Sequence, residues 1–378
     1  MRFLNKLPRW SSARNSYSAI GLELMDEAVN LVQFSVDDGV PRASAAATVV
    51  FDGGREDLIA SPERLKQLLK PVLAKDFKGT RVHSCLPPEY FKLMYVNYRL
   101  NKAQNEAEAI TNQMRERLTG DLADYVIDYL PVRTQSSNAE NLALVSVSPR
   151  DAVIRYLEFL RKAGLTADAL EIGPVALNRL LAVTSSSSER DNHLSITFGQ
   201  EKTYLSVHSG RRLLLDREVA LGEVQVIDQL CQALEVDQAF AKRMLYRELN
   251  LGVDDQFDAQ ALLEEHSDTL IQILKPLFVK LVDEINRAMS YTASQTRGEP
   301  IRHIFLLGSA AHWPLAGHLL STLVKIPVHV LYPIARYDAL QKFLNIPDHL
   351  HDHCLAVASG LALRGLVLRG EGLKGLDK

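Results

Sequence analysis

The spacing of apolar and polar residues predicts two similar groups of β-strands, one at the start of the chain and one in its middle. In the first group, Ser18–Phe34 alternates on both sides of a turn at residues 25–27, and Ala43–Phe51 follows a second turn. Alternation with a period of two is typical of strands, so these segments predict a three-strand meander. The second group has the same pattern and consists of His193–Phe198, Lys202–Val207 and Arg211–Val219.

Helices and further strands follow each meander, so the two halves of the chain resemble each other and suggest an internal duplication. The helices predicted in the first half are Ser61–Ala74, Arg150–Ala163 and Pro174–Ala182, and the strands are Val82–Leu86, Leu142–Val147 and Asp168–Ile172. In the second half, helices are predicted at Glu223–Leu249, Asp258–Ala293, Pro314–Val324 and Asp352–Leu368, with strands at His303–Leu307 and Val328–Leu331. This order of strands and helices predicts an α/β fold with two lobes.

A block from residue 89 to residue 139 interrupts the first half. Its strand, helix and strand, at Lys92–Arg99, Gln104–Leu118 and Tyr125–Leu130, predict a small βαβ unit. The polar run TSSSSERDN at residues 184–192 predicts a linker between the lobes. The predicted parts are a basic N-terminal arm (1–16), lobe 1 (17–88 and 140–183), an inserted α/β subdomain (89–139), the linker (184–192) and lobe 2 (193–378), with a helical subdomain at about 223–297.

Composition and charge narrow the class of protein. The chain has 378 residues, of which 47% are hydrophobic and 24% charged, which is typical of a globular protein with more than one core. A net charge of -3 gives no reason to expect a nucleic-acid partner. The cysteines are far apart in sequence, without metal-site or disulfide spacing, and no stretch reaches the roughly 18 apolar residues of a membrane span. These features predict a cytoplasmic protein.

The first sixteen residues, MRFLNKLPRWSSARNS, differ from the rest because basic and apolar residues alternate without an acidic one. Such a segment fits a surface anchor or a docking arm. It equally fits an unstructured terminus, since it is short and contains Pro8. The sequence leaves both interpretations open.

Histidines are concentrated in the C-terminal quarter of the chain. The run HLHDH at residues 349–353 has a spacing that metal sites also use. Because Asp348 and Asp352 are typical helix caps, a solvated helix start is the favoured interpretation. No catalytic Ser, Cys/His or HExxH motif is present, so enzyme classes other than an ATPase have no support.

Five segments carry a resemblance to a known family by their order and spacing. They are IGLELMDEAVNLVQF at 20–34, DREVALGEVQV at 216–226, IFLLGSAAHWPLAGHL at 304–319, KIPVHVLYP at 325–333 and ASGLALRGL at 358–366. With them the chain resembles the PilM family of type IV pilus assembly proteins, including the MshI-like members of the mannose-sensitive haemagglutinin (MSHA) pilus system. The resemblance implies a two-lobed actin-like fold in which the inserted block lies where the family has its extra subdomain and where FtsA has a comparable insertion. It also implies binding of the cytoplasmic tail of a PilN-like bitopic inner-membrane protein.

The actin-like family holds nucleotide phosphates between two hairpin turns, and both turns are altered here. In the first turn, Met25 stands where glycine would allow close approach, and Glu23 and Asp26 place carboxylates beside the phosphate position. Asn30 replaces a lysine that many relatives carry. The second turn keeps Gly199 and Thr203, but Thr197 replaces the expected aspartate.

The remaining nucleotide contacts that the resemblance implies are partly kept. Gly308 and Ser309 occupy the adenosine turn, and Lys242 matches the helix that contacts ribose. The degenerate cleft thus comprises Glu23, Asp26, Gly199, Thr203, Lys242, Gly308 and Ser309. These changes favour a pseudo-ATPase without catalytic residues, which binds no cofactor or binds ATP and Mg²⁺ weakly. An active ATP-dependent switch stays open, because Glu23 or Asp26 could replace the metal-binding aspartate.

Partner binding is predicted at aromatic residues of the inserted block: Tyr90, Phe91, Tyr95 and Tyr98. Alternation along a strand places Tyr95 opposite Tyr90 and Tyr98, so one set must lie outside the core. Together with the resemblance, this predicts a scaffold of MSHA-like type IV pilus biogenesis, peripheral at the inner face of the inner membrane. A homo-oligomer, and an FtsA-like membrane-associated filament protein, remain alternatives.

Overall fold

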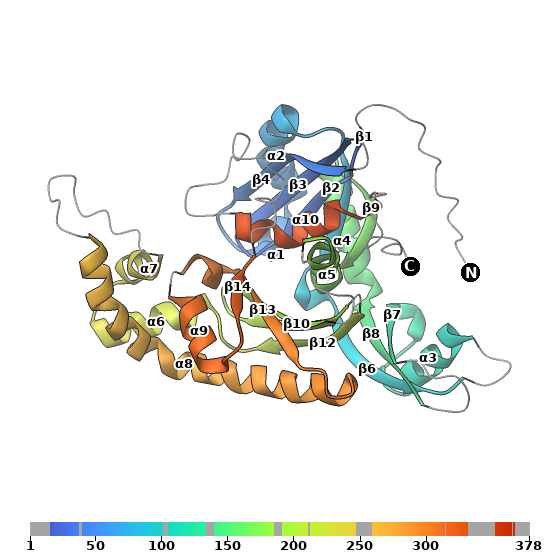
Figure 1. Cartoon of the computed structure of the whole chain (residues 1–378). Helices are drawn as coiled ribbons and strands as arrows, with labels where there is room; N and C mark the ends of the chain where they lie inside the picture. Colours follow the sequence, from blue (N-terminus) through green and yellow to red (C-terminus); the bar gives the residue numbers. More distant parts are fainter. Residues whose placement is uncertain are drawn as a thin grey trace.

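The computed structural model describes residues 16–37, 40–100, 105–133, 140–184, 191–210, 212–246, 259–313, 315–331, 352–364 and 366. Two large sheets form the centres of two lobes, and a smaller sheet lies beside them (Figure 1). This confirms the predicted two-lobed α/β class. Three predictions lie largely outside the described residues: the arm at 1–16, the linker at 184–192, of which 185–190 are not described, and the histidines of the HLHDH run.

Lobe 1 is built on the predicted meander. Its strands β2 (Ile20–Leu24), β3 (Ala28–Asp37) and β4 (Val40–Val50) pair antiparallel, and the short β1 (Ser16–Tyr17) also pairs with β3. Strands β5 (Arg81–Leu86) and β9 (Thr166–Ile172) extend the sheet in parallel with β2. Helices α1 (Arg55–Ala60), α2 (Pro62–Asp76) and α4 (Arg150–Lys162) pack on one face, through a core that includes Leu58, Leu65 and Tyr156.

The opposite face of lobe 1 carries α5 (Gly173–Thr184) and the closing helix α10 (Ala356–Ala362). A Cβ on Gly21 would lie 1.9 Å from the Ala358 oxygen, and one on Gly360 would lie 2.0 Å from the Ala176 oxygen. The small residues of ASGLALRGL therefore let α10 fit between β2 and α5. The closing helix is shorter than predicted, follows a 3₁₀ turn at Asp352–Leu355, and packs on lobe 1 although its sequence was assigned to lobe 2.

Lobe 2 repeats the strand order of lobe 1. Its sheet runs β12 (Arg212–Val219), β11 (Thr203–Ser209), β10 (Asn192–Phe198), β13 (Ile301–Gly308) and β14 (Val328–Val330). The first three strands pair antiparallel and the last two run parallel to β10, as β4, β3, β2, β5 and β9 do in lobe 1. The repeated order is the structural counterpart of the predicted duplication.

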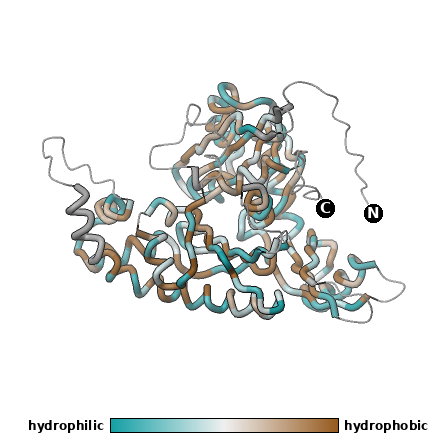
Figure 2. Tube along the Cα trace, in the orientation of Figure 1, coloured by the Kyte–Doolittle hydropathy of each residue, from teal (hydrophilic) through white to brown (hydrophobic). Residues whose placement is uncertain are grey.

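The helices of lobe 2 pack against its sheet and against one another. They are α6 (Glu223–Leu234), α7 (Gln238–Tyr246), α8 (Ala259–Gln295) and α9 (Ala316–Val324), with a 3₁₀ turn at Ser309–His312. The single helix predicted at Glu223–Leu249 is divided, because Glu235 adopts a left-handed φ of 54° and ends α6. Hydrophobic and hydrophilic positions alternate along α8, while hydrophobic ones follow the central strands (Figure 2). None of the described helices combines the length and apolar character needed to cross a membrane.

The inserted subdomain differs from the predicted βαβ unit. Strands β6 (Lys92–Tyr98), β8 (Asn141–Pro149) and β7 (Tyr125–Arg133) form an antiparallel sheet in the order β6-β8-β7. Strand β8, which was assigned to lobe 1, is its central strand, so the insertion continues past residue 139. Helix α3 (Glu106–Arg115) covers one face, and short 3₁₀ turns lie at Pro88–Tyr90 and Leu122–Asp124.

The other face of the insert packs on lobe 2. Val132 and Leu144 belong to the same buried cluster as the lobe 2 strands. The Tyr95 hydroxyl donates a hydrogen bond to the Leu214 oxygen at 2.5 Å, and Arg212 Nη1 donates to the Val132 oxygen at 3.0 Å. The insert is continuous in sequence with lobe 1, so it bridges the two lobes (Figure 1).

Candidate functional site

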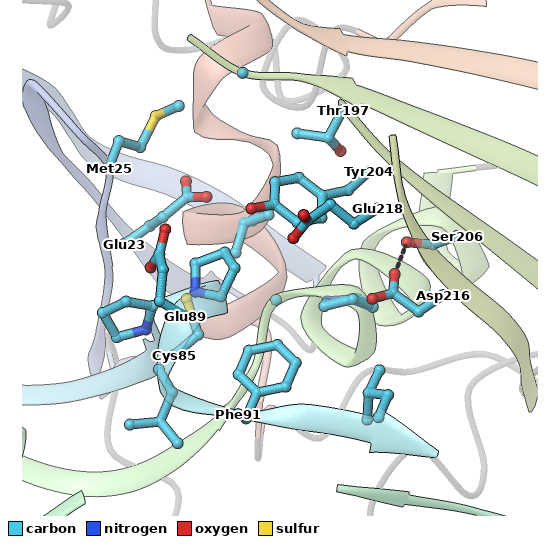
Figure 3. A pocket seen from close by; sticks show the side chains of 18 of the residues that line it. Glu23, Met25, Cys85, Glu89, Phe91, Thr197, Tyr204, Ser206, Asp216 and Glu218 are labelled. Atoms are coloured by element: carbon cyan, nitrogen blue, oxygen red, sulfur yellow. Dashed lines mark hydrogen bonds between the residues drawn. The ribbon is translucent and has the colours of Figure 1, made fainter. Parts of the chain in front are cut away.

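A cavity of about 450 Å³ lies where lobe 1, lobe 2 and the insert meet. Its walls come from the β2–β3 turn and the start of α5 in lobe 1, from β10–β12 in lobe 2, and from residues 86–94 at the start of the insert. Figure 3 shows Glu23 and Met25 on one side, Tyr204, Asp216 and Glu218 on the other, and Phe91 just before strand β6 of the insert. The cavity is therefore a junction of three parts of the fold.

Apolar side chains and carboxylates make up most of the lining. The carboxylates are Glu23 and Asp26 from lobe 1, Glu89 from the insert, and Asp216 and Glu218 from lobe 2. Among the lining residues the cations are Arg55 and Lys92. This excess of negative charge disfavours an anionic ligand and favours one with basic groups.

Arg55 connects lobe 1 with the insert at the rim of this cavity. Its side chain is 10% exposed, and Nη2 lies 2.9 Å from Asp26 Oδ1 and 2.5 Å from Glu89 Oε1. Nη1 also donates a hydrogen bond to the Leu24 oxygen at 3.3 Å. The guanidinium charge is thus already balanced by protein carboxylates.

Two of the carboxylates are partly desolvated. Burial raises the pKa of Glu23 to about 7, against the hydrogen bond from Asn30 and the charge of Arg55, which lower it. Burial likewise raises the pKa of Asp216 to about 6, although Ser206 Oγ donates to its Oδ1 at 2.5 Å. Both groups therefore change charge close to neutral pH.

Asn30 organises the first turn. Its Nδ2 lies 3.2 Å from Glu23 Oε2, 3.0 Å from Met25 Sδ and 2.8 Å from the Cys354 oxygen, while Thr48 Oγ1 donates to its Oδ1 at 2.9 Å. The amide thus connects the turn to the 3₁₀ segment before α10. The substitution at this position was visible in the sequence, but its partner Cys354 is distant along the chain and gave no local signal.

The predicted nucleotide residues line this cavity only in part. Glu23, Asp26 and Gly199 line the cavity, whereas Thr203, Lys242, Gly308 and Ser309 do not. The Thr203 hydroxyl donates to the Leu221 oxygen at 2.6 Å, and the Ser309 hydroxyl to the Phe198 oxygen at 3.3 Å. Lys242 Nζ lies 3.5 Å from Glu223 Oε1. In these described residues each polar group already has a protein partner.

Contacts within the protein explain why glycine is needed at the two retained positions. Gly308 has a φ of 73°, and a Cβ there would lie 2.1 Å from the Phe198 oxygen. A Cβ on Gly199 would lie 2.8 Å from the Lys202 oxygen. Close approach of backbone to backbone explains both residues without a phosphate. The donors and carboxylates of this cleft do not fit a triphosphate, because the lining offers negative charge where phosphates need hydrogen-bond donors.

Comparison of the sequence with models of known families assigns the chain to a family. A family model described as type IV pilus assembly protein PilM matches residues 21–366. The chain belongs to the PilM family. This confirms the resemblance inferred from the five segments, and with it the actin-like fold. A search of curated proteins found no match.

Two solved structures have a similar fold over nearly the whole chain. A chain of the PilM–PilN type IV pilus biogenesis complex is 20% identical, with 92% of this chain and 98% of that chain covered and a TM-score of 0.67. The ethanolamine utilization protein EutJ from Carboxydothermus hydrogenoformans is 14% identical, with coverages of 94% and 92% and a TM-score of 0.50. At these identities the matches show the fold alone.

The aromatic residues predicted to bind a partner fall into two groups in this PilM-family chain. Tyr90 and Tyr98 are only 6% and 2% exposed, and their hydroxyls donate to Glu56 and Glu106. Tyr90 lies in a 3₁₀ turn rather than in β6, so the alternation argument does not apply to it. Phe91 lines the cavity, and Tyr95 packs on lobe 2. Partner binding remains a prediction for these two, while little of the other two rings is accessible.

Proposed function

We propose that this PilM-family chain is a scaffold of type IV pilus assembly that binds the cytoplasmic tail of a PilN-like inner-membrane protein in the three-walled cavity. Binding would hold the chain at the inner face of the inner membrane. Family membership supports the assembly role. The likeness to a chain of the PilM–PilN complex supports the choice of partner.

The observation that carries the proposal is the combination of charge, apolar surface and a strand edge in one cavity. Of the five lining carboxylates, Asp26 and Glu89 pair with Arg55 and Glu218 pairs with Lys202, which leaves Glu23 and Asp216 to receive a basic group of the ligand. Lys92, Leu93 and Met94 of β6 also line the cavity, and β6 is an edge strand of its sheet. An extended peptide can pair with such an edge while its side chains enter apolar pockets. The cavity thus suits an extended tail with apolar residues and at least one basic residue.

We also propose that the chain is a pseudo-ATPase of the MshI-like type. Met25 occupies the first turn, Thr197 replaces an aspartate in the second, and Lys242 is engaged by Glu223. An ATP-dependent switch would need these groups to be released when nucleotide binds. The contacts therefore support a scaffold that acts without ATP turnover.

Peptide binding to site variants tests the proposal. A fluorescent peptide of the tail of the PilN-like partner is titrated with the wild-type chain, with Phe91→Ala and with Asp216→Asn. Both changes remove lining groups, so we expect at least tenfold weaker binding for each. Val279→Ala is the matched control, because Val279 is 41% exposed on α8 and does not line the cavity. Equal affinity for all four proteins would place the partner elsewhere.

A further inference from the structure

Four histidines cross one face of the lobe 2 sheet. His193 on β10 is in register with His208 on β11 and with His303 on β13. His329 on β14 is in register with Phe305, two residues after His303. Residues two apart on a strand share a face, and so do register partners, so all four imidazoles lie on the same side of the sheet. Strands β13 and β14 lie side by side in Figure 1.

The two histidines nearest the β14 edge of the sheet, His303 and His329, are separated by the distance expected of two ligands of one metal ion. His303 Nδ1 and His329 Nε2 are 3.3 Å apart. Two nitrogens bound to one tetrahedral Zn²⁺ at about 2.0–2.1 Å lie about 3.3–3.4 Å from each other. His329 is exposed and His303 is half-buried, so an ion can reach both rings from solvent. A single hydrogen bond between the rings also fits this distance, and the experiment below separates the two.

The surroundings hold the pair in place. The Phe305 ring lies 6.0 Å from the His329 ring and 5.8 Å from the His193 ring, measured between centroids. His193 is 4% exposed and its Nε2 has no hydrogen-bond partner.

We propose that His303 and His329 bind one divalent transition-metal ion of the Zn²⁺ type, with water in the remaining positions. Within the described part of the chain no group of three or more His, Cys, Asp and Glu side chains could hold a metal, so the described residues supply two ligands to this site. Neutral imidazole is a preferred ligand of Zn²⁺. The ion would connect β13 to β14, an edge strand of only three residues.

Zinc titration by calorimetry tests this site directly. It uses the full chain and the same chain carrying His349→Ala, His351→Ala and His353→Ala, which removes the HLHDH run as a competing binder. In that second chain, His303→Ala and His329→Ala are each expected to weaken Zn²⁺ binding at least tenfold. His318→Ala is the matched control, since His318 is an exposed histidine on α9 of the same lobe.

Two further readouts distinguish a metal site from a hydrogen-bonded pair. Co²⁺ bound to both imidazoles should give visible absorption bands that disappear in either single variant. Zn²⁺ should raise the unfolding midpoint of the parent and of His318→Ala, but not of the two site variants. The proposal is overturned if Zn²⁺ fails to bind, or if it binds equally well when His303 or His329 is replaced.

Discussion

The resemblance predicts Glu23 beside the phosphate position of an actin-like nucleotide site, and in the structure burial controls the pKa of its carboxyl group. The Asn30 amide and the charge of Arg55 stabilise its ionised form, and burial outweighs both. The pKa therefore rises from 4.5 to about 7. Between these values the unfolded chain loses the proton while the folded chain keeps it. Folded-state stability from this group thus falls as pH rises from about 4.5 to 7.

Replacing Glu23 with glutamine should remove this pH dependence. Because the side chain is half-buried, we expect Glu23→Gln to raise the free energy of unfolding by about 1 to 2 kcal/mol at pH 8 and to change it little near pH 4. Urea unfolding at both pH values measures the difference. Glu27→Gln, an exposed change in the same turn, is the control. A gain of equal size at both pH values would show that desolvation of a charge is not the cause.

At the level of elements, the contact of α10 with β2 depends on a glycine. Gly21→Ala would place a methyl group 1.9 Å from the Ala358 oxygen, so β2 and α10 must separate. We expect a loss of about 1–3 kcal/mol or more in the free energy of unfolding, measured by denaturant titration. Gly54→Ala is the control, because no atom lies within 4 Å of its Cβ position and its φ is -87°. Similar losses in both variants would contradict the close approach.

The hydrogen bond of Tyr95 between the insert and lobe 2 leads to a second prediction about the elements. Tyr95→Phe removes the hydrogen bond to the Leu214 oxygen and keeps the ring that packs on Tyr291 at 5.6 Å. The loss should be about 0.5–1.5 kcal/mol, with faster hydrogen exchange in β12. Tyr125→Phe provides the comparison, since its hydroxyl bonds to Thr119 within the insert. Unchanged exchange in β12 would mean that this contact does not couple the two parts.

Elements were predictable from the sequence where the signal is local. Both meanders and the helices at Pro62–Asp76 and Arg150–Lys162 follow from alternation and periodicity within short windows. The central place of β8 and the docking of α10 on lobe 1 depend on pairing with distant segments. Periodicity carries no information about such partners.

The candidate site was predictable only in part for the same reason. Glu23, Asp26 and Gly199 were identified and do line the cavity. Asp216 and Glu218 were missed as site residues, because they lie on an ordinary strand and acquire their role from the lobe 1 and insert residues opposite them. The segment DREVALGEVQV was used only for the family resemblance, and its place between the lobes, which gives Asp216 and Glu218 their role, depends on distant residues.

At the scale of the whole molecule, the insert adds a third wall to a cleft that two lobes would otherwise form. Hydrogen bonds of Tyr95 and Arg212 join the insert to lobe 2, and the ion pair of Arg55 with Glu89 joins it to lobe 1. Opening the lobes would therefore require these contacts to break. Such a bridged molecule suits a fixed binding surface better than a cleft that cycles with nucleotide.

The central claim is that the cavity binds a partner tail independently of nucleotide. Calorimetric titration of the wild-type chain with the tail peptide of the PilN-like partner, with and without saturating ATP and Mg²⁺, tests it most directly. The account predicts one peptide per chain with the same affinity in both conditions, and no heat from ATP alone. Micromolar ATP binding that changes the affinity for the peptide would contradict the scaffold and establish a nucleotide-dependent switch.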